Sequence, residues 1–115
     1  KNTPQKAAGT VDINVTKSPQ GFVIDLEGLE LNDTEQPGGP VSEKWVETID
    51  SVRIDFNYRE EIFRPGLVEV PGLNELIQLR HQIDSEDLGE SFAVVLTDVF
   101  GREFRTTGPW PTALG

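Results

Sequence analysis

The side chains of this chain that could do acid–base chemistry are a single histidine and a large excess of carboxylates, and the chain has no cysteine. His81 is the one side chain whose ordinary pKa makes proton transfer easy at neutral pH. Its neighbours Arg80 and Gln82 are polar, and no serine or acid stands in a recognised catalytic motif with it. We therefore expect His81 to be a solvated or edge-strand residue and predict that the protein is not an enzyme.

Acidic residues gather in two segments. The first covers residues 25–50 and contains a single base, Lys44, and the second covers residues 84–90 at a probable turn. Loops rich in carboxylates bind hard cations such as calcium. Neither segment follows the Asp-x-Asp-x-Asp-Gly pattern of a calcium loop. We predict no metal ligand and no cofactor, and we keep a small ligand- or Ca2+-binding domain as the alternative function.

The net charge of −10 restricts the classes of partner. Nucleic acids and anionic membrane surfaces would be repelled, and no run of about 18 apolar residues predicts a membrane span. We therefore expect neither nucleic-acid binding nor direct membrane insertion. The expected partner is another protein or the remainder of a parent chain. In isolation we expect a monomer, because like charges on every copy oppose self-association.

The start of the chain and its composition say little about the cellular compartment. The sequence opens at Lys1, without methionine or an apolar signal region, so we expect a domain excised from a larger protein. The missing cysteines argue against a disulfide-stapled secreted module. This leaves the compartment open, with a preference for an extracytoplasmic or cell-envelope location. The two Asn-x-Thr sequons, at Asn14 and Asn32, are interpreted as accidental.

Alternating apolar and polar residues predict strands over most of the chain. The clearest case is residues 51–59, where Val52, Ile54, Phe56 and Tyr58 alternate with polar residues, so Phe56 is expected in the core. Residues 10–26 and 92–106 each predict a hairpin with a type I turn, at residues 18–21 and 98–101.

Two segments allow both helix and strand. Residues 42–50 favour a short helix with Ser42 as its cap, and a strand is the alternative. Residues 73–84 fit either period, and we favour a strand because the flanking segments are strands. Residues 32–41 are rich in proline and glycine and predict a long connection that crosses between sheets.

Together these segments predict an all-β fold: an immunoglobulin-like two-sheet β-sandwich of about seven short strands with one short helical turn. The hairpin over residues 94–104 resembles the closing hairpin of bacterial immunoglobulin-like domains. Residues 1–9 are expected to be a flexible lead-in and residues 10–115 a single β-sandwich domain. The function predicted for such a fold is that of a non-catalytic immunoglobulin-like interaction or structural module.

Three apolar residues are the candidates for a contact surface. Val99 and Phe100 occupy the centre of a tight turn, where large apolar side chains either pack back onto a neighbouring loop or contact a partner. Trp45 is the third candidate. Loops carry recognition residues on rigid sheets, so residues 32–41 and 63–72 are candidate contact segments as well.

Overall fold

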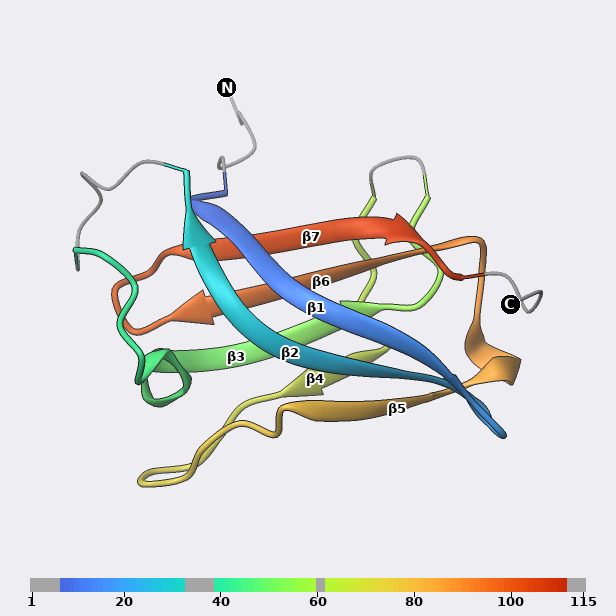
Figure 1. Cartoon of the computed structure of the whole chain (residues 1–115), viewed down its shortest axis with the longest axis horizontal. Helices are drawn as coiled ribbons and strands as arrows, with labels where there is room; N and C mark the ends of the chain where they lie inside the picture. Colours follow the sequence, from blue (N-terminus) through green and yellow to red (C-terminus); the bar gives the residue numbers. More distant parts are fainter. Residues whose placement is uncertain (1–6, 33–38, 60–61, 112–115) are drawn as a thin grey trace.

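The computed structural model describes residues 7–32, 39–59 and 62–111 of the chain (Figure 1). These residues form seven strands and two short 3-10 helices. The strands are β1 (Gly9–Ser18), β2 (Gly21–Leu31), β3 (Ile49–Asp55), β4 (Leu67–Glu69), β5 (Arg80–Asp84), β6 (Ser91–Asp98) and β7 (Glu103–Pro109); the helices are η1 (Trp45–Thr48) and η2 (Ser85–Asp87). The predictions of an all-β fold and of about seven strands are confirmed. The short helix predicted within residues 42–50 is present as η1, but Ser42 is not its cap: Lys44 occupies that position, and the Ser42 hydroxyl accepts the N–H of Lys44 at 3.1 Å.

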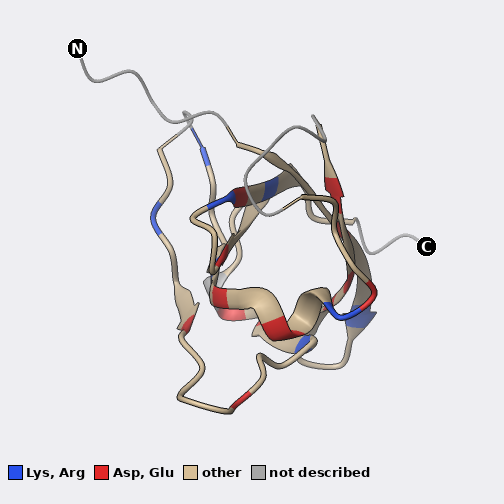
Figure 2. Ribbon diagram, turned by 90° about the vertical axis from the view of Figure 1, so that its left-hand side faces the viewer, with Lys and Arg blue, Asp and Glu red and all other residues tan. Residues whose placement is uncertain are grey.

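All seven strands lie in one sheet, in the order β4-β3-β6-β7-β1-β2-β5. Neighbouring strands are antiparallel except β1 and β7, which are parallel. The sheet curls into a half-barrel, and Figure 2 shows it end-on as a ring around the core. The predicted two-sheet sandwich is therefore replaced by one continuous sheet, because β7 pairs with β1 where a sandwich would separate its layers.

Strand length and a bulge explain how one sheet surrounds the core. The β1–β2 hairpin is long, and its register shifts between Asp12 and Ile13. Such a bulge bends a strand and increases its twist, which turns the hairpin over the interior. The curl brings the two edge strands near each other, and the Glu69 carboxylate accepts a hydrogen bond from the backbone N–H of Gln78 at 3.0 Å.

The core fills the inside of this curl. It is built from side chains that alternate along the strands, with Phe104, Ile24, Ile54 and Leu96 fully buried. At the end where β7 finishes, the Trp110 ring stacks on Phe22 with centroids 5.3 Å apart. Its Nε1 donates to the main-chain carbonyl oxygen of residue 56 at 2.9 Å. The Trp110 ring therefore covers this end of the half-barrel, and its polar nitrogen has a hydrogen-bond partner.

The predicted strand over residues 51–59 is shorter than its sequence pattern. β3 ends at Asp55, and Phe56 and Tyr58 are half-buried in the turn and loop that follow. The prediction that Phe56 lies in the core between two sheets is wrong. The strand stops because the Asp55 carboxylate, expected on the wet face, is buried and accepts hydrogen bonds from main-chain N–H groups of the next loop.

Two further boundaries differ from expectation. Of residues 73–84, Arg80–Asp84 alone forms a strand, because Gly72 and Asn74, the latter at φ 67°, turn the chain before it. At the N-terminus, the expected lead-in ends early: Ala8 is buried and donates its N–H to the main-chain oxygen of Glu103. Residues 1–6 of that lead-in, and residues 33–38 of the predicted crossing loop, lie outside the described residues.

Both predicted hairpins are present, with different reasons for their glycines. At the second turn Gly101 has φ 82°, the left-handed conformation expected for a type I turn with a bulge. At the first turn Gly21 has φ 157° instead, and a Cβ there would collide with the carbonyl oxygen of Ile83. Gly21 is thus required both by its positive φ, which residues with a side chain rarely adopt, and by the close approach of β5.

Candidate functional site

The three predicted contact residues lie at one end of the half-barrel, opposite Trp110. Val99 and Phe100 form the tip of the β6–β7 turn, and Trp45 begins η1 beside it. The N–H of Val99 donates to the carbonyl oxygen of Thr48 at 2.8 Å, which fastens the turn to η1. Sequence reasoning selected Val99 and Phe100 as one turn and Trp45 separately, and the fold brings Trp45 beside that turn.

A buried ion pair between Asp98 and Arg102 stabilises the β6–β7 turn. One Asp98 carboxylate oxygen accepts from the backbone N–H groups of Phe100 at 3.0 Å and Arg102 at 2.8 Å, and the other accepts from Arg102 Nε at 2.7 Å. The Arg102 guanidinium also donates to the Gly39 carbonyl oxygen at 2.6 Å. Both charged side chains are almost fully buried. The tip is therefore a rigid platform for the side chains that it carries.

The Phe100 side chain packs against Arg102 and is also half exposed to solvent. Its ring lies over the Arg102 guanidinium at 5.2 Å, yet it is 50% exposed. With Trp45, Val41 and Leu29 it lines a small pocket of about 170 Å³. The Phe100 side chain is therefore partly packed and partly exposed, and its role as a contact residue stays a prediction.

Val99 faces a larger depression on the other side of the tip. This groove has a volume of about 630 Å³ and lies between the β6–β7 turn and the loop between β4 and β5. About half of its lining is polar, and it is called the apolar groove below for the exposed leucine and valine side chains in its walls. Its apolar lining includes Ile49, Pro71, Leu73, Leu76 and Val99. Figure 1 shows that loop projecting from the sheet at the same end as η1.

The loop that forms the outer wall of the groove is shaped by local hydrogen bonds. Glu75 donates its N–H to the carbonyl oxygen of Gly72 at 3.0 Å, and its carboxylate accepts from the N–H of Gly72 at 2.9 Å. This tight turn leaves Leu73 92% exposed at its tip. Sequence reasoning missed Leu73 and Leu76 as surface residues because it assigned them to a strand. The Pro71-Gly72 pair and Asn74 were the turn signal that would have shown it.

His81, the single histidine, contacts the main chain of Gln78 and the side chain of Glu69. It lies on the edge strand β5, as one of the two expectations had it, but it is buried rather than solvated. Its Nε2 lies 2.9 Å from the Gln78 carbonyl oxygen and 3.8 Å from a Glu69 carboxylate oxygen. The Glu69 contact connects strand β5 to strand β4, and the Gln78 contact lies within the chain just before β5.

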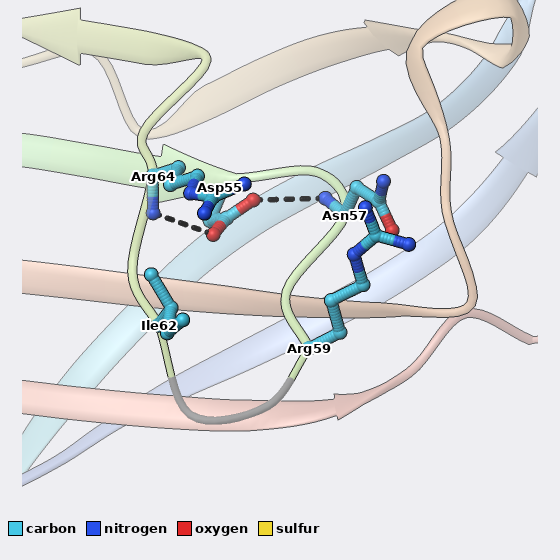
Figure 3. Close-up of a pocket in the computed structure, with 5 residues that line it drawn as sticks. All are labelled: Asp55, Asn57, Arg59, Ile62 and Arg64. Carbon is cyan, nitrogen blue, oxygen red and sulfur yellow. Dashed lines mark hydrogen bonds between the residues drawn. The ribbon is translucent and has the colours of Figure 1, made fainter.

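A polar pocket of about 310 Å³ beside the end of β3 is the next candidate (Figure 3). It is lined by Asp55, Asn57, Arg59, Ile62 and Arg64. The two Asp55 oxygens accept from the N–H groups of Asn57 at 2.9 Å and Arg64 at 2.7 Å. The carboxylate thereby connects the two ends of the loop.

Neither a metal site nor a membrane span is found in the described ranges. Within residues 7–32, 39–59 and 62–111, no group of three or more His, Cys, Asp or Glu side chains is placed to hold a metal ion. In the same ranges no helix is both long enough and apolar enough to cross a bilayer.

The end that carries Trp45, Val99 and Phe100 is thus the surface with the most distinctive chemistry, a rigid apolar tip between a pocket and a groove. Comparisons of the chain with models of known protein families, with curated proteins and with solved structures each find no match.

Proposed function

We propose that the protein is a non-catalytic interaction module that binds another protein, or a further part of a longer chain, through the apolar groove and the Val99–Phe100 tip. Like immunoglobulin-like domains, it would present recognition residues on loops held by a rigid sheet. The sheet would supply that rigidity, and the exposed side chains at the groove and the tip would supply the contacts.

The observation that carries the proposal is the clustering of exposed apolar side chains. Among the described residues, eight large apolar side chains are exposed, and five of them fall within residues 68–79; Val99 and Phe100 at the neighbouring turn are two more. Three of the eight, Leu73, Leu76 and Val99, line the groove. Single exposed apolar residues are ordinary, whereas several that line one groove are typical of a contact site. Leu73 in particular has no packing task that would explain a leucine.

Selection of displayed random peptides tests this function directly. The protein is used as bait, and binders are counter-selected on a Leu73→Ser/Leu76→Ser double variant. We expect peptides that bind the wild type and not this variant, because the groove supplies the apolar contact. Ile62→Ser, at an exposed apolar residue that does not line the groove, is the matched control and should retain binding.

The groove variants should fold as the wild type does. Leu73, Leu76 and Val99 are all more than half exposed, so replacing each with serine should change the unfolding free energy by less than about 0.5 kcal/mol. Urea denaturation measures this. A selection that yields no groove-dependent peptide from a stable protein would exclude the proposed function.

A further inference from the structure

Resting on the proposed function, we infer that the apolar groove binds a cationic amphipathic peptide segment of a partner protein. Such a segment inserts apolar side chains beside Leu73, Leu76 and Val99 and places lysine or arginine side chains against the carboxylates of Glu47 and Asp50.

The apolar part of the partner follows from the groove wall. Leu76 and Val99 are 59% and 55% exposed and face the same depression from two different loops. A side chain bound between them would be desolvated on both sides, which is the geometry of a binding hot spot. The two walls are each fixed by hydrogen bonds, at Val99 N to Thr48 O and at Glu75 N to Gly72 O, so little ordering accompanies binding.

The cationic part follows from the charges at the groove. Glu47 on η1 and Asp50 on β3 are exposed and line it, and Glu75 adds a third carboxylate that also accepts the Gly72 N–H. No lysine or arginine is among the described residues that line the groove, and Lys44, the nearest base in sequence to η1, is not one of them. Figure 2 looks onto this end of the molecule and shows acidic residues on and next to η1, with one basic residue at the start of the helix.

The same charges exclude a second copy of the chain as the occupant. Two copies that paired about a twofold axis at the groove would place Glu47 and Asp50 near their own counterparts. Like charges at an interface oppose association, and the net charge of −10 adds a long-range repulsion. A cationic segment would be attracted both by these local carboxylates and by the overall negative charge of the protein.

The test uses defined synthetic peptides and the complete chain labelled with ¹⁵N. The first probe is a short acetylated peptide in which leucines alternate with lysines. The second replaces its lysines with glutamates, and the third replaces its leucines with serines. We expect the leucine–lysine peptide to shift the backbone amide signals of Leu73, Leu76 and Val99, and each of the other two to bind at least about tenfold more weakly.

Matched charge variants separate groove binding from general attraction to an acidic protein. A Glu47→Gln/Asp50→Asn double variant should weaken the leucine–lysine peptide at least about threefold and reduce its salt dependence. Glu27→Gln, at an exposed acid on β2 that does not line the groove, should leave the affinity unchanged.

Each other outcome overturns the inference in a distinguishable way. Equal binding of the leucine–glutamate peptide at the same amides would refute the cationic partner and leave the interaction function standing. An equal loss of peptide affinity in Glu27→Gln would show that the overall charge, and not the carboxylates of the groove, attracts the peptide. No shift of groove signals by any of the peptides would also refute the inference, and the peptide selection described above would then decide the proposed function alone.

Discussion

The carboxylate of Asp98 is the acceptor for three donors, the N–H groups of Phe100 and Arg102 and the Nε of Arg102. The exposed fractions of its side chain and of Arg102 are 1% and 6%. A pair buried to this degree stabilises little compared with apolar packing, but removal of one partner leaves the other charge without compensation. The stability of the contact surface therefore depends on a residue that cannot touch a partner.

Replacing Asp98 with alanine is the first prediction. Asp98→Ala should lower the unfolding free energy by about 3–5 kcal/mol, because Arg102 stays buried without its counter-charge. Asp98→Asn retains an acceptor oxygen and should cost less. Urea denaturation measures both, with the exposed Asp50→Ala as the control within about 0.5 kcal/mol. A loss no larger than that of Asp50→Ala would show that the pair is not needed.

Glu30 gives the protein a predictable response to pH. The Asp12 side chain, through a hydrogen bond and through its charge, raises the pKa of the Glu30 carboxyl. A raised folded-state pKa contributes stability that is fully present below the ordinary pKa of glutamate, about 4.3, and that is lost as the pH rises through the folded-state value.

Glu30→Gln tests this sign. The variant should have a higher melting temperature than the wild type at pH 7, where the Glu30 charge faces Asp12, and the difference should vanish below about pH 4. Glu27→Gln, on the same strand, should run parallel to the wild type. If the wild type is more stable than Glu30→Gln at pH 7, the Glu30 charge does not destabilise the folded state and the prediction is wrong.

At the scale of elements, the turn between β1 and β2 shows where close packing, in addition to a positive φ, selects a glycine. Gly21→Ala should be destabilising by about 1–3 kcal/mol, because the added methyl group meets the backbone of β5 and overpacks it. Gly101→Ala has open space and costs about 1 kcal/mol for its left-handed backbone alone. Gly101→Asn should recover part of that loss, whereas Gly21→Asn should recover none. Thermal unfolding of the four variants decides it.

The hairpins were predictable because their determinants are local. Ser18-Pro19-Gln20-Gly21 and Asp98-Val99-Phe100-Gly101 carry the turn in the sequence itself. The end of β3 was not predictable from alternation, since Asp55 satisfies its carboxylate with main-chain N–H groups that appear only when the next loop folds over it. The same holds for Leu73 and Leu76, whose spacing fits two kinds of element.

At the scale of the whole molecule, the single curled sheet depends on contacts that no local pattern specifies. Thr106 Oγ1 donates to the Val11 carbonyl oxygen at 2.6 Å and accepts from the Val11 N–H at 2.9 Å, across 95 positions of the chain. The sequence therefore predicts most of the strands but not the pairing that joins them into one curled sheet. For the same reason it predicts the Val99–Phe100 turn and Trp45 as separate candidates, and only the fold places them at the same end.

Charge at this scale predicts the state of association. At a net charge of −10, the protein should be monomeric at moderate salt and micromolar concentration. Light scattering measures the mass. Salt that screens the charges should make any weak dimer more populated, so a dimer already present at low salt would count against the prediction.

The parallel pairing of β1 with β7 gives the domain a mechanical property. Gly9 lies beside Phe104, and the two strands run in the same direction, so tension on the two ends of the chain slides β1 along β7. The two hydrogen bonds between Thr106 Oγ1 and the Val11 backbone would then bear the pulling force together instead of breaking one after the other. In single-molecule stretching, Thr106→Val should unfold at lower force than the wild type, and Thr107→Val, exposed on the same strand, should not. Placed in a chain under tension, this fold would behave as a clamp that resists extension.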